Sequence, residues 1–253
     1  MATTRPTTID EVLVRLNILI DDAVRSGARI GYFAALYERV TSNVRRALVA
    51  GNVFDDGPRM ERLDVVFANR FLEAWDQHVR GEPPTESWSV AFAALDDPGV
   101  LVVQHLMLGM NAHISLDLGI AAATIAPTPE ALGGLRADFM RINDVLARLV
   151  RVVEGELLQI CPRLQRLADV VDVEDRVFGF GLNVSRDIAW KLAEDLAAAP
   201  RDRWPALIAT RDRLSAAAGR ALYPLHGAAR ATARWILEGE SKDIKHNIQV
   251  VAE

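Results

Sequence analysis

The sequence predicts an all-α fold, a single-domain bundle of about eight to ten helices. Apolar residues recur at spacings of three and four along most of the 253 residues, and no stretch alternates as a strand does. Half of the residues are apolar and a quarter are charged, which is typical of a globular chain. No polar linker is long enough to separate domains. We therefore expect one domain over 1–253, with its core in 28–200 and a peripheral tail over 239–253.

Capping residues mark the predicted helix boundaries in the first third of the chain. Thr8 with Glu11 forms a capping-box pattern before the first helix, and Gly27 ends that helix. Gly51 ends the second helix, and Pro58 stands near the first position of the third. The predicted helices cover, in order, 9–26, 29–50, 58–80, a short segment around 88–95, 100–126, 135–160, 163–170, 174–198, a segment from about 202, and one ending at 237.

Prolines and glycines mark the boundaries in the rest of the chain. Asp97 and Pro98 are a good N-cap and first position for the central helix, which should end before Pro127. The pair Gly133 and Gly134 predicts an interruption before the long helix over 135–160, because glycine is a poor helix former. Prolines at 162, 200 and 224 separate the later helices.

Composition excludes several classes of partner. A net charge of -5 argues against nucleic acid, because phosphate binding needs a clustered basic surface. A single cysteine, Cys161, rules out an internal disulfide framework and fits a reducing cytoplasm, and residues 1–12 lack the apolar segment of a signal peptide. We expect a cytoplasmic protein with a small-molecule partner and no membrane span. The sequence leaves a homo-oligomer open.

The central helix combines strong apolar character with polar residues that a core helix holds at a cost. Residues 100–126 contain His105, Asn111, His113 and Asp117. Burying one such group without a partner costs on the order of 1 to 3 kcal/mol. His113 and Asp117 lie one helical turn apart on the same face, the spacing at which two side chains bind one metal ion or a carboxylate orients an imidazole.

These residues predict a metal centre as the leading hypothesis. Zinc, iron or manganese would suit an imidazole and a carboxylate, and further ligands would come from facing helices. Asp64 and Asp138 are the best suppliers, because each stands beside an apolar helix face. Two alternatives stay open for His113 and Asp117. They could form an internal salt bridge with a structural role, or Asp117 could orient His113 as a general base without a metal.

Three further residues are candidates for catalysis, namely His105, Asn111 and Arg186. His105 lies about 12 Å along the helix axis from His113, too far to share a mononuclear site with Asp117. Arg186 and Trp190 are one turn apart and could cover an anionic ligand with a cation and an aromatic ring. The alternative is a salt bridge from Arg186 beside a core tryptophan.

The chain also resembles a known family in four runs, QHLMLGMNAHISLDLGIAAA, LDVVFANRFLEAW, DFMRIND and SRDIAWKLAEDL. They resemble an uncharacterised, mainly actinobacterial family known only as a domain of unknown function, over about residues 28–200. The resemblance implies no activity, but its runs contain all seven candidate site residues. Ser115 stands where the run suggests asparagine. A looser similarity to helical zinc-dependent phospholipases and nucleases lacks the H-x-x-x-E partner of a three-zinc site.

The sequence thus predicts a metal-dependent enzyme, a hydrolase or an oxygenase, which acts on a small and rather apolar molecule. Two other classes remain. The polar cluster could bind a hydrophobic ligand without catalysis, or it could form a structural network that fixes the packing of the bundle.

Overall fold

The computed structural model describes residues 5–165 and 179–253, and within these ranges every regular element is helical. The all-α prediction is confirmed, although the described residues contain more helices than the eight to ten expected. The elements are α1 (Ile9–Ser26), α2 (Ile30–Ala50), α3 (Gly57–Val79), α4 (Glu86–Ala93), α5 (Val102–Ala112), a π-helical turn η1 (His113–Leu118), α6 (Gly119–Ile125), α7 (Pro129–Ile160), α9 (Gly179–Ala198), a 3-10 turn η2 (Arg201–Arg203), α10 (Trp204–Leu222), α11 (Gly227–Leu237) and α12 (Ile244–Ala252).

The predicted ends of α1 and α2 are confirmed by their caps. Thr8 Oγ1 accepts a hydrogen bond from the Glu11 backbone N–H at 3.2 Å. Gly27 and Gly51 have φ of +69° and +71°, in the left-handed region where a side chain is unfavourable. The Glu11 carboxylate also accepts hydrogen bonds from the backbone N–H and the hydroxyl of Thr7.

Two predicted helix starts are wrong. Asp97 and Pro98 do not begin the central helix, because α5 starts at Val102 and the Val102 N–H donates to the Glu240 carboxylate at 3.1 Å. Glu240, which is distant in sequence, therefore accepts a hydrogen bond from the first turn of this helix, where the helix dipole is positive. The long helix starts at Pro129 instead of 135, capped by Thr128, and the pair of glycines at 133 and 134 stays helical within it. Most of the helix predicted over 163–170, and the predicted start at 174, lie outside the described residues.

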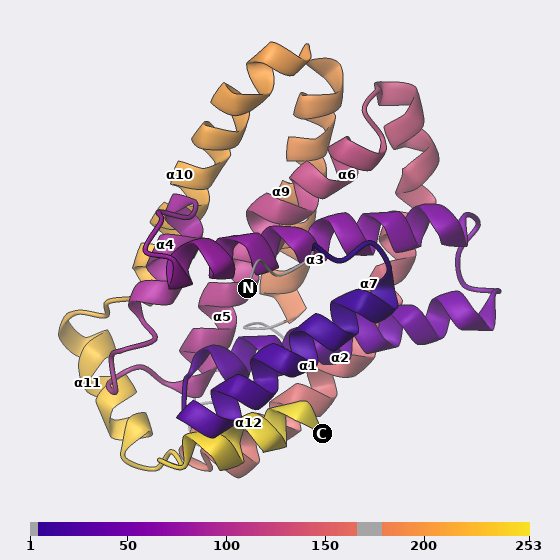
Figure 1. Ribbon diagram of the computed structural model, residues 1–253. Coiled ribbons are helices and arrows are strands. Elements are labelled where there is room, and N and C mark those ends of the chain that lie inside the picture. The colour runs from indigo at the N-terminus through magenta and orange to yellow at the C-terminus, as the bar shows by residue number, and fades with distance from the viewer. Residues whose placement is uncertain (1–4, 166–178) are drawn as a thin grey trace.

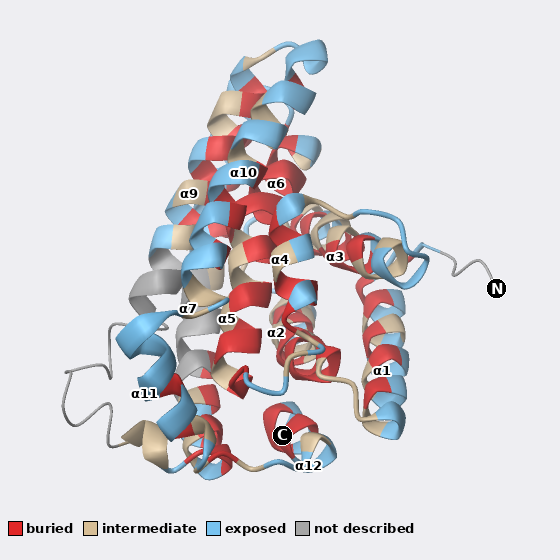
Figure 2. Cartoon of the chain, turned by 90° about the vertical axis from the view of Figure 1, so that its left-hand side faces the viewer, coloured by how far each residue is buried: buried red, intermediate tan, exposed pale blue. Residues whose placement is uncertain are grey.

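The helices form two groups around two clusters of buried apolar side chains. Figure 1 shows α6, α9 and α10 above α3, and α1, α2 and α12 below it. The lower cluster joins α1, α2, α4, α5 and α12, and the upper one joins α6, α9 and the amino-terminal part of α7. Figure 2 shows buried residues along one side of most helices, as the apolar periodicity predicts, whereas α11 is largely exposed.

The carboxyl-terminal segment is a correction to the predicted peripheral tail over 239–253. Residues 244–252 form α12, which packs on α2, and Ile248 and Val251 are fully buried. Ile248 lies so close to Gly31 that a Cβ at position 31 would be 2.5 Å from its Cδ1 atom. Ile244, Ile248 and Val251 are spaced by four and three residues, so the segment carries a short apolar stripe within polar surroundings.

The segment α5–η1–α6 runs through the middle of the molecule. Val102–Ile125 is long and apolar enough to cross a membrane by length and composition, and 78% of its most apolar window is buried inside the protein, as in a core helix. Glycines permit this close packing. A Cβ at Gly109 would lie 2.3 Å from the Phe33 ring, and one at Gly119 would lie 2.5 Å from the Ala189 carbonyl oxygen. The space beside Gly109 is therefore occupied by an aromatic ring.

Candidate functional site

A change of helix type sets the geometry of the site. The backbone is α-helical up to Ala112, adopts a π-helical turn over His113–Leu118, and returns to α-helix at Gly119. Isolated π turns within α-helices are rare and occur frequently at functional sites. Here the turn contains both members of the predicted pair, His113 and Asp117, and both are buried.

Asp117 is the centre of a buried hydrogen-bond network. One of its oxygens, Oδ1, accepts from Arg70 Nε of α3 at 2.6 Å. The other, Oδ2, lies 2.8 Å from Trp88 Nε1 of α4 and 3.1 Å from His113 Nδ1. Burial alone would raise the pKa of Asp117, but Arg70, His113 and Trp88 together hold it below its ordinary value. The ionised carboxylate thus joins three elements, and both oxygens are engaged.

The Asp117 carboxylate fixes the tautomer of His113. A carboxylate only accepts hydrogen bonds, so Nδ1 carries the proton that it donates to Asp117. Burial lowers the pKa of His113, and the contact with Asp117 offsets only part of that effect. The neutral ring stacks on Phe67 with centroids 3.6 Å apart, and Tyr37 stands edge-on to it at 4.6 Å. Nε2 therefore presents a free lone pair, and it has no hydrogen-bond partner among the described residues.

His113 lines a largely apolar cavity of about 100 Å³ between the two apolar clusters. The walls come from α2, α3, the central segment, α7 and α9. The lining residues are Phe33, Leu36, Tyr37, Val40, Val44, Leu63, Asp64, Phe67, Met110, His113, Ile114, Leu118, Ile142, Leu149, Val153 and Arg186. The cavity lies where helices of the two groups meet, because the side chains of neither cluster fill that space.

Asp64 and Arg186 add two buried polar groups to the same cavity. Asp64 Oδ2 and Arg186 Nε are both buried without a hydrogen-bond partner among the described residues. Burial, with a smaller contribution from the charge of Glu61, raises the pKa of Asp64 to about 7. Burial lowers the pKa of Arg186 to about 10. Together with His113 Nε2 and the Tyr37 hydroxyl oxygen, the residues that line the cavity carry four buried polar atoms without a hydrogen-bond partner among the described residues.

Arg186 makes a different aromatic contact from the one expected. Its guanidinium lies over the Phe139 ring, with its carbon 4.4 Å from the ring centroid, and Nη2 donates to the Phe139 carbonyl oxygen at 2.5 Å. The Trp190 ring is tilted against the Phe139 ring, with centroids 4.8 Å apart, and Nε1 donates to Glu194. The predicted pair of Arg186 with Trp190 is thus replaced by a pair with Phe139.

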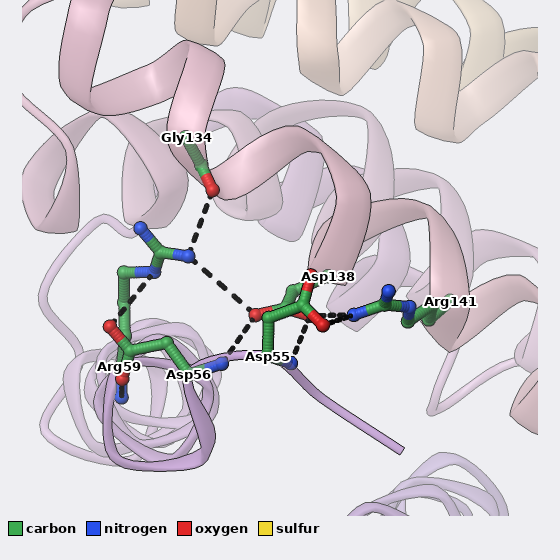
Figure 3. Close-up of polar contacts among 6 residues, drawn as sticks. All are labelled: Asp55, Asp56, Arg59, Gly134, Asp138 and Arg141. Carbon is green, nitrogen blue, oxygen red and sulfur yellow. Dashed lines mark hydrogen bonds and ion pairs between the residues drawn. The ribbon is translucent and has the colours of Figure 1, made fainter. Parts of the chain in front are cut away.

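Asp138 does not join His113, which corrects the predicted ligand set. Figure 3 shows its carboxylate binding the loop between α2 and α3. Oδ1 accepts from the Asp55 N–H at 2.8 Å and from Arg141 at 2.7 Å, and Oδ2 accepts from the Asp56 N–H at 3.0 Å. Arg59 lies 3.6 Å from Oδ2. This satisfied carboxylate ties α7 to the start of α3 and has a structural role.

Two predicted catalytic residues also lie away from the cavity lining. Asn111 donates from Nδ2 to the Ser215 carbonyl oxygen at 2.8 Å and so joins α5 to α10. His105 packs against Tyr32 with ring centroids 5.6 Å apart, and neither ring nitrogen has a hydrogen-bond partner among the described residues. Burial lowers the pKa of His105 to about 3, so this ring is a neutral core side chain. Of the three, only Arg186 borders the cavity.

The four predicted metal ligands do not assemble. Among residues 5–165 and 179–253, no group of three or more His, Cys, Asp or Glu side chains is arranged to hold a metal ion. Asp117 acts as the orienting partner of His113, and Asp138 belongs to the loop network. His113 and Asp64 remain at the cavity.

Sequence reasoning missed the residues that complete the site, namely Arg70, Trp88, Tyr37 and Phe67. A buried aspartate requires donors, so the existence of partners such as Arg70 and Trp88 follows from Asp117. Their identity depends on which helices pack against η1, and that information is not local. The contact of Tyr37 with the imidazole likewise depends on how α2 packs against η1.

Comparison with known proteins identifies a family but no activity. A family model described as a family of unknown function (DUF5995) matches residues 9–224. No curated protein and no solved structure matches the chain. The resemblance expected from the sequence is therefore confirmed at the level of the family, and the match includes the π turn and every residue of the cavity lining.

Proposed function

This chain belongs to a protein family of unknown function (DUF5995), and we propose that it binds a small, largely apolar molecule in the cavity beside His113. The observation that carries the proposal is the unpartnered Nε2 of His113, a residue that lines the apolar cavity while Asp117 binds the other ring nitrogen. A bound molecule would place its polar group among the polar atoms that the lining leaves without partners and its apolar part among the apolar side chains.

Energetic cost supports a ligand over a purely structural network. Each buried polar atom without a partner costs about 1 to 3 kcal/mol, and Tyr37, Asp64, His113 and Arg186 each contribute one. A structural carboxylate would be expected to have both oxygens hydrogen-bonded, as Asp138 does. A ligand with polar and apolar parts would satisfy the atoms that the protein leaves open.

The size of the cavity limits the ligand. A dry apolar cavity of about 150 Å³ binds benzene in another protein. A cavity of about 100 Å³ is smaller than that one, so it suits a small molecule whose body is no wider than a benzene ring. The apolar lining favours an aliphatic or aromatic body with one polar group.

The same geometry supports acid–base chemistry as a second function. Asp117 holds His113 in the tautomer whose Nε2 can accept a proton, and it would stabilise the imidazolium that results. Asp64, with a pKa of about 7, is a second group able to exchange a proton near neutral pH. In this function His113 would be the general base, and the bound molecule would carry the proton that it removes.

The metal-dependent hydrolase or oxygenase that the sequence suggested stays a prediction. His113 Nε2 is the one atom of the original pair that is free to bind an ion, with Asp117 as its hydrogen-bonded support. Asp64 is the remaining candidate ligand at the cavity. A stoichiometric metal ion in purified protein, lost in His113→Ala and retained in Asp138→Ala, would favour this function.

Filling the cavity is expected to abolish binding. Val40 of α2 lines the cavity, and Val40→Phe would place a ring in the space proposed for the ligand. Wild type should bind 1-hexanol in calorimetric titration with a dissociation constant of about 1 mM or lower, given its seven non-hydrogen atoms. In Val40→Phe the affinity should fall at least about tenfold, a loss of about 1.4 kcal/mol.

The matched control is the same substitution on the same helix at an exposed position. Val49 of α2 is 76% exposed, and Val49→Phe should bind 1-hexanol as wild type does. Circular dichroism would establish that both variants are folded. Equal affinity of Val40→Phe and Val49→Phe, or no binding to wild type, would contradict the proposed function.

A further inference from the structure

The environment of Arg186 is unusual for a buried cation. Its side chain is 5% exposed, and no carboxylate among the described residues forms an ion pair with it. An unpaired buried charge is strongly unfavourable, and proteins compensate it with a counter-ion or a ligand. Burial lowers the pKa of Arg186, and the charge of the exposed residue Asp187 offsets only part of that decrease. Within the described part of the chain, Arg186 is therefore a buried cation at the cavity without a carboxylate partner.

The contacts of the guanidinium leave one edge available. Phe139 covers a face of the group, and its carbonyl oxygen accepts one Nη2–H. The Nε–H remains without a partner among the described residues. A guanidinium presents its Nε–H and an Nη–H as parallel donors along one edge, and that pair fits the two oxygens of a carboxylate.

We propose that the cavity ligand is a small monocarboxylate whose carboxylate binds Arg186 and whose aliphatic or aromatic body fills the apolar space. This inference rests on the proposed function and adds the chemical class of the ligand. The apolar lining selects a short hydrocarbon body, and the single unpaired cation selects one negative charge. A phosphate is less suitable, because its higher charge and three oxygens need more donors than this lining provides.

The acidic residues near the cavity fit this assignment. The Asp117 carboxylate forms an ion pair with Arg70, so it would not present an unpaired negative charge to the ligand. Asp64 holds a raised pKa, so it can be neutral when an anion is bound nearby. A carboxylate ligand would therefore lie near one cation, Arg186, and no residue of the cavity lining would have to carry a negative charge beside it. Arg186 would act as the anchor that positions the ligand relative to His113.

Two probes of equal chain length separate charge from apolar binding. Calorimetric titrations at neutral pH would compare hexanoate with 1-hexanol for wild type, Arg186→Met and Arg186→Lys. Arg136→Met is the matched control, because Arg136 is an exposed arginine of α7 that lies 5.4 Å from the Trp190 ring. Arg186→Met keeps an unbranched apolar stem, and Arg186→Lys keeps the charge without the paired donors.

The expected result is a preference of wild type for hexanoate over 1-hexanol of at least about tenfold, as for a charge-assisted paired hydrogen bond. Arg186→Met should lose this preference, while Arg136→Met should retain it. Arg186→Lys should show an intermediate preference, and it carries the test if Arg186→Met does not fold. Equal binding of both probes by wild type, or an unchanged preference in Arg186→Met and Arg186→Lys, would overturn the inference and leave the proposed function standing. Failure of both probes to bind wild type would overturn both.

Discussion

Replacing Asp117 by alanine is expected to lower the free energy of unfolding by about 3 to 5 kcal/mol, the usual cost of removing one partner of a buried charge network. The substitution would leave Arg70 Nε, Trp88 Nε1 and His113 Nδ1 without their acceptor in the interior. Chemical denaturation measures the change. Binding of 1-hexanol should also weaken, because nothing would hold the imidazole with Nε2 toward the cavity.

The second buried aspartate provides the control for this prediction. Asp138 is as buried as Asp117, but its partners belong to the loop before α3. Asp138→Ala should therefore lose stability while retaining the affinity of the folded protein for 1-hexanol. A loss below about 1 kcal/mol in Asp117→Ala would mean that the network contributes no more than an exposed ion pair. Equal effects of the two substitutions on affinity would show that Asp117 has no special role at the cavity.

Removing Glu156 is expected to cost a similar amount, about 3 to 5 kcal/mol. Arg39 of α2 donates to Glu156 of α7 at 2.5 Å and to the Val251 carbonyl oxygen of α12 at 2.9 Å, and both side chains are about nine-tenths buried. Glu156→Ala would leave the Arg39 charge between three helices. The double substitution Arg39→Met with Glu156→Met should recover most of the loss, because two apolar side chains need no counter-charge.

A double-mutant cycle by chemical denaturation measures this coupling. The expected coupling is large, since each single substitution leaves a buried charge and the double one leaves none. Additive losses in the cycle would contradict the interpretation. The result also tests the attachment of α12, because Arg39 donates to the Val251 carbonyl oxygen of that helix. If the carboxyl-terminal segment were weakly attached, loss of the Val251 contact would not change the free energy of unfolding.

The fold was largely predictable because its signals are local. Apolar residues at spacings of three and four place the helices, and Gly27 and Gly51 end two of them. The errors arose where distant contacts overrule local preference. Glu240 supplies the acceptor that lets α5 begin at Val102, and tertiary packing keeps α7 helical through its two glycines. The stripe of α12 is only nine residues long, too short to stand out in a polar segment.

The site was predictable in part, for a different reason. A histidine and an aspartate one turn apart in a very apolar helix indicate a buried pair, and that pair forms. The sequence carries no sign of the π turn, which contains no proline and follows from how η1 packs against its neighbours. Asp64 and Asp138 both stand beside apolar stripes, and only the fold separates the one at the cavity from the one in a loop network.

The most direct test of the central claim is nitrogen NMR of the His113 ring in labelled protein, assigned with His113→Asn and followed from pH 5 to 8. The lowered pKa predicts a ring that is neutral at pH 7 and gains a second proton only below the ordinary range of histidine, with the proton of the neutral ring on Nδ1 and a bare Nε2. Saturation with 1-hexanol should shift the Nε2 resonance and leave the other histidines nearly unchanged. A proton on Nε2, a ring that titrates near its ordinary pKa, or a resonance that does not respond to saturating ligand would contradict the account.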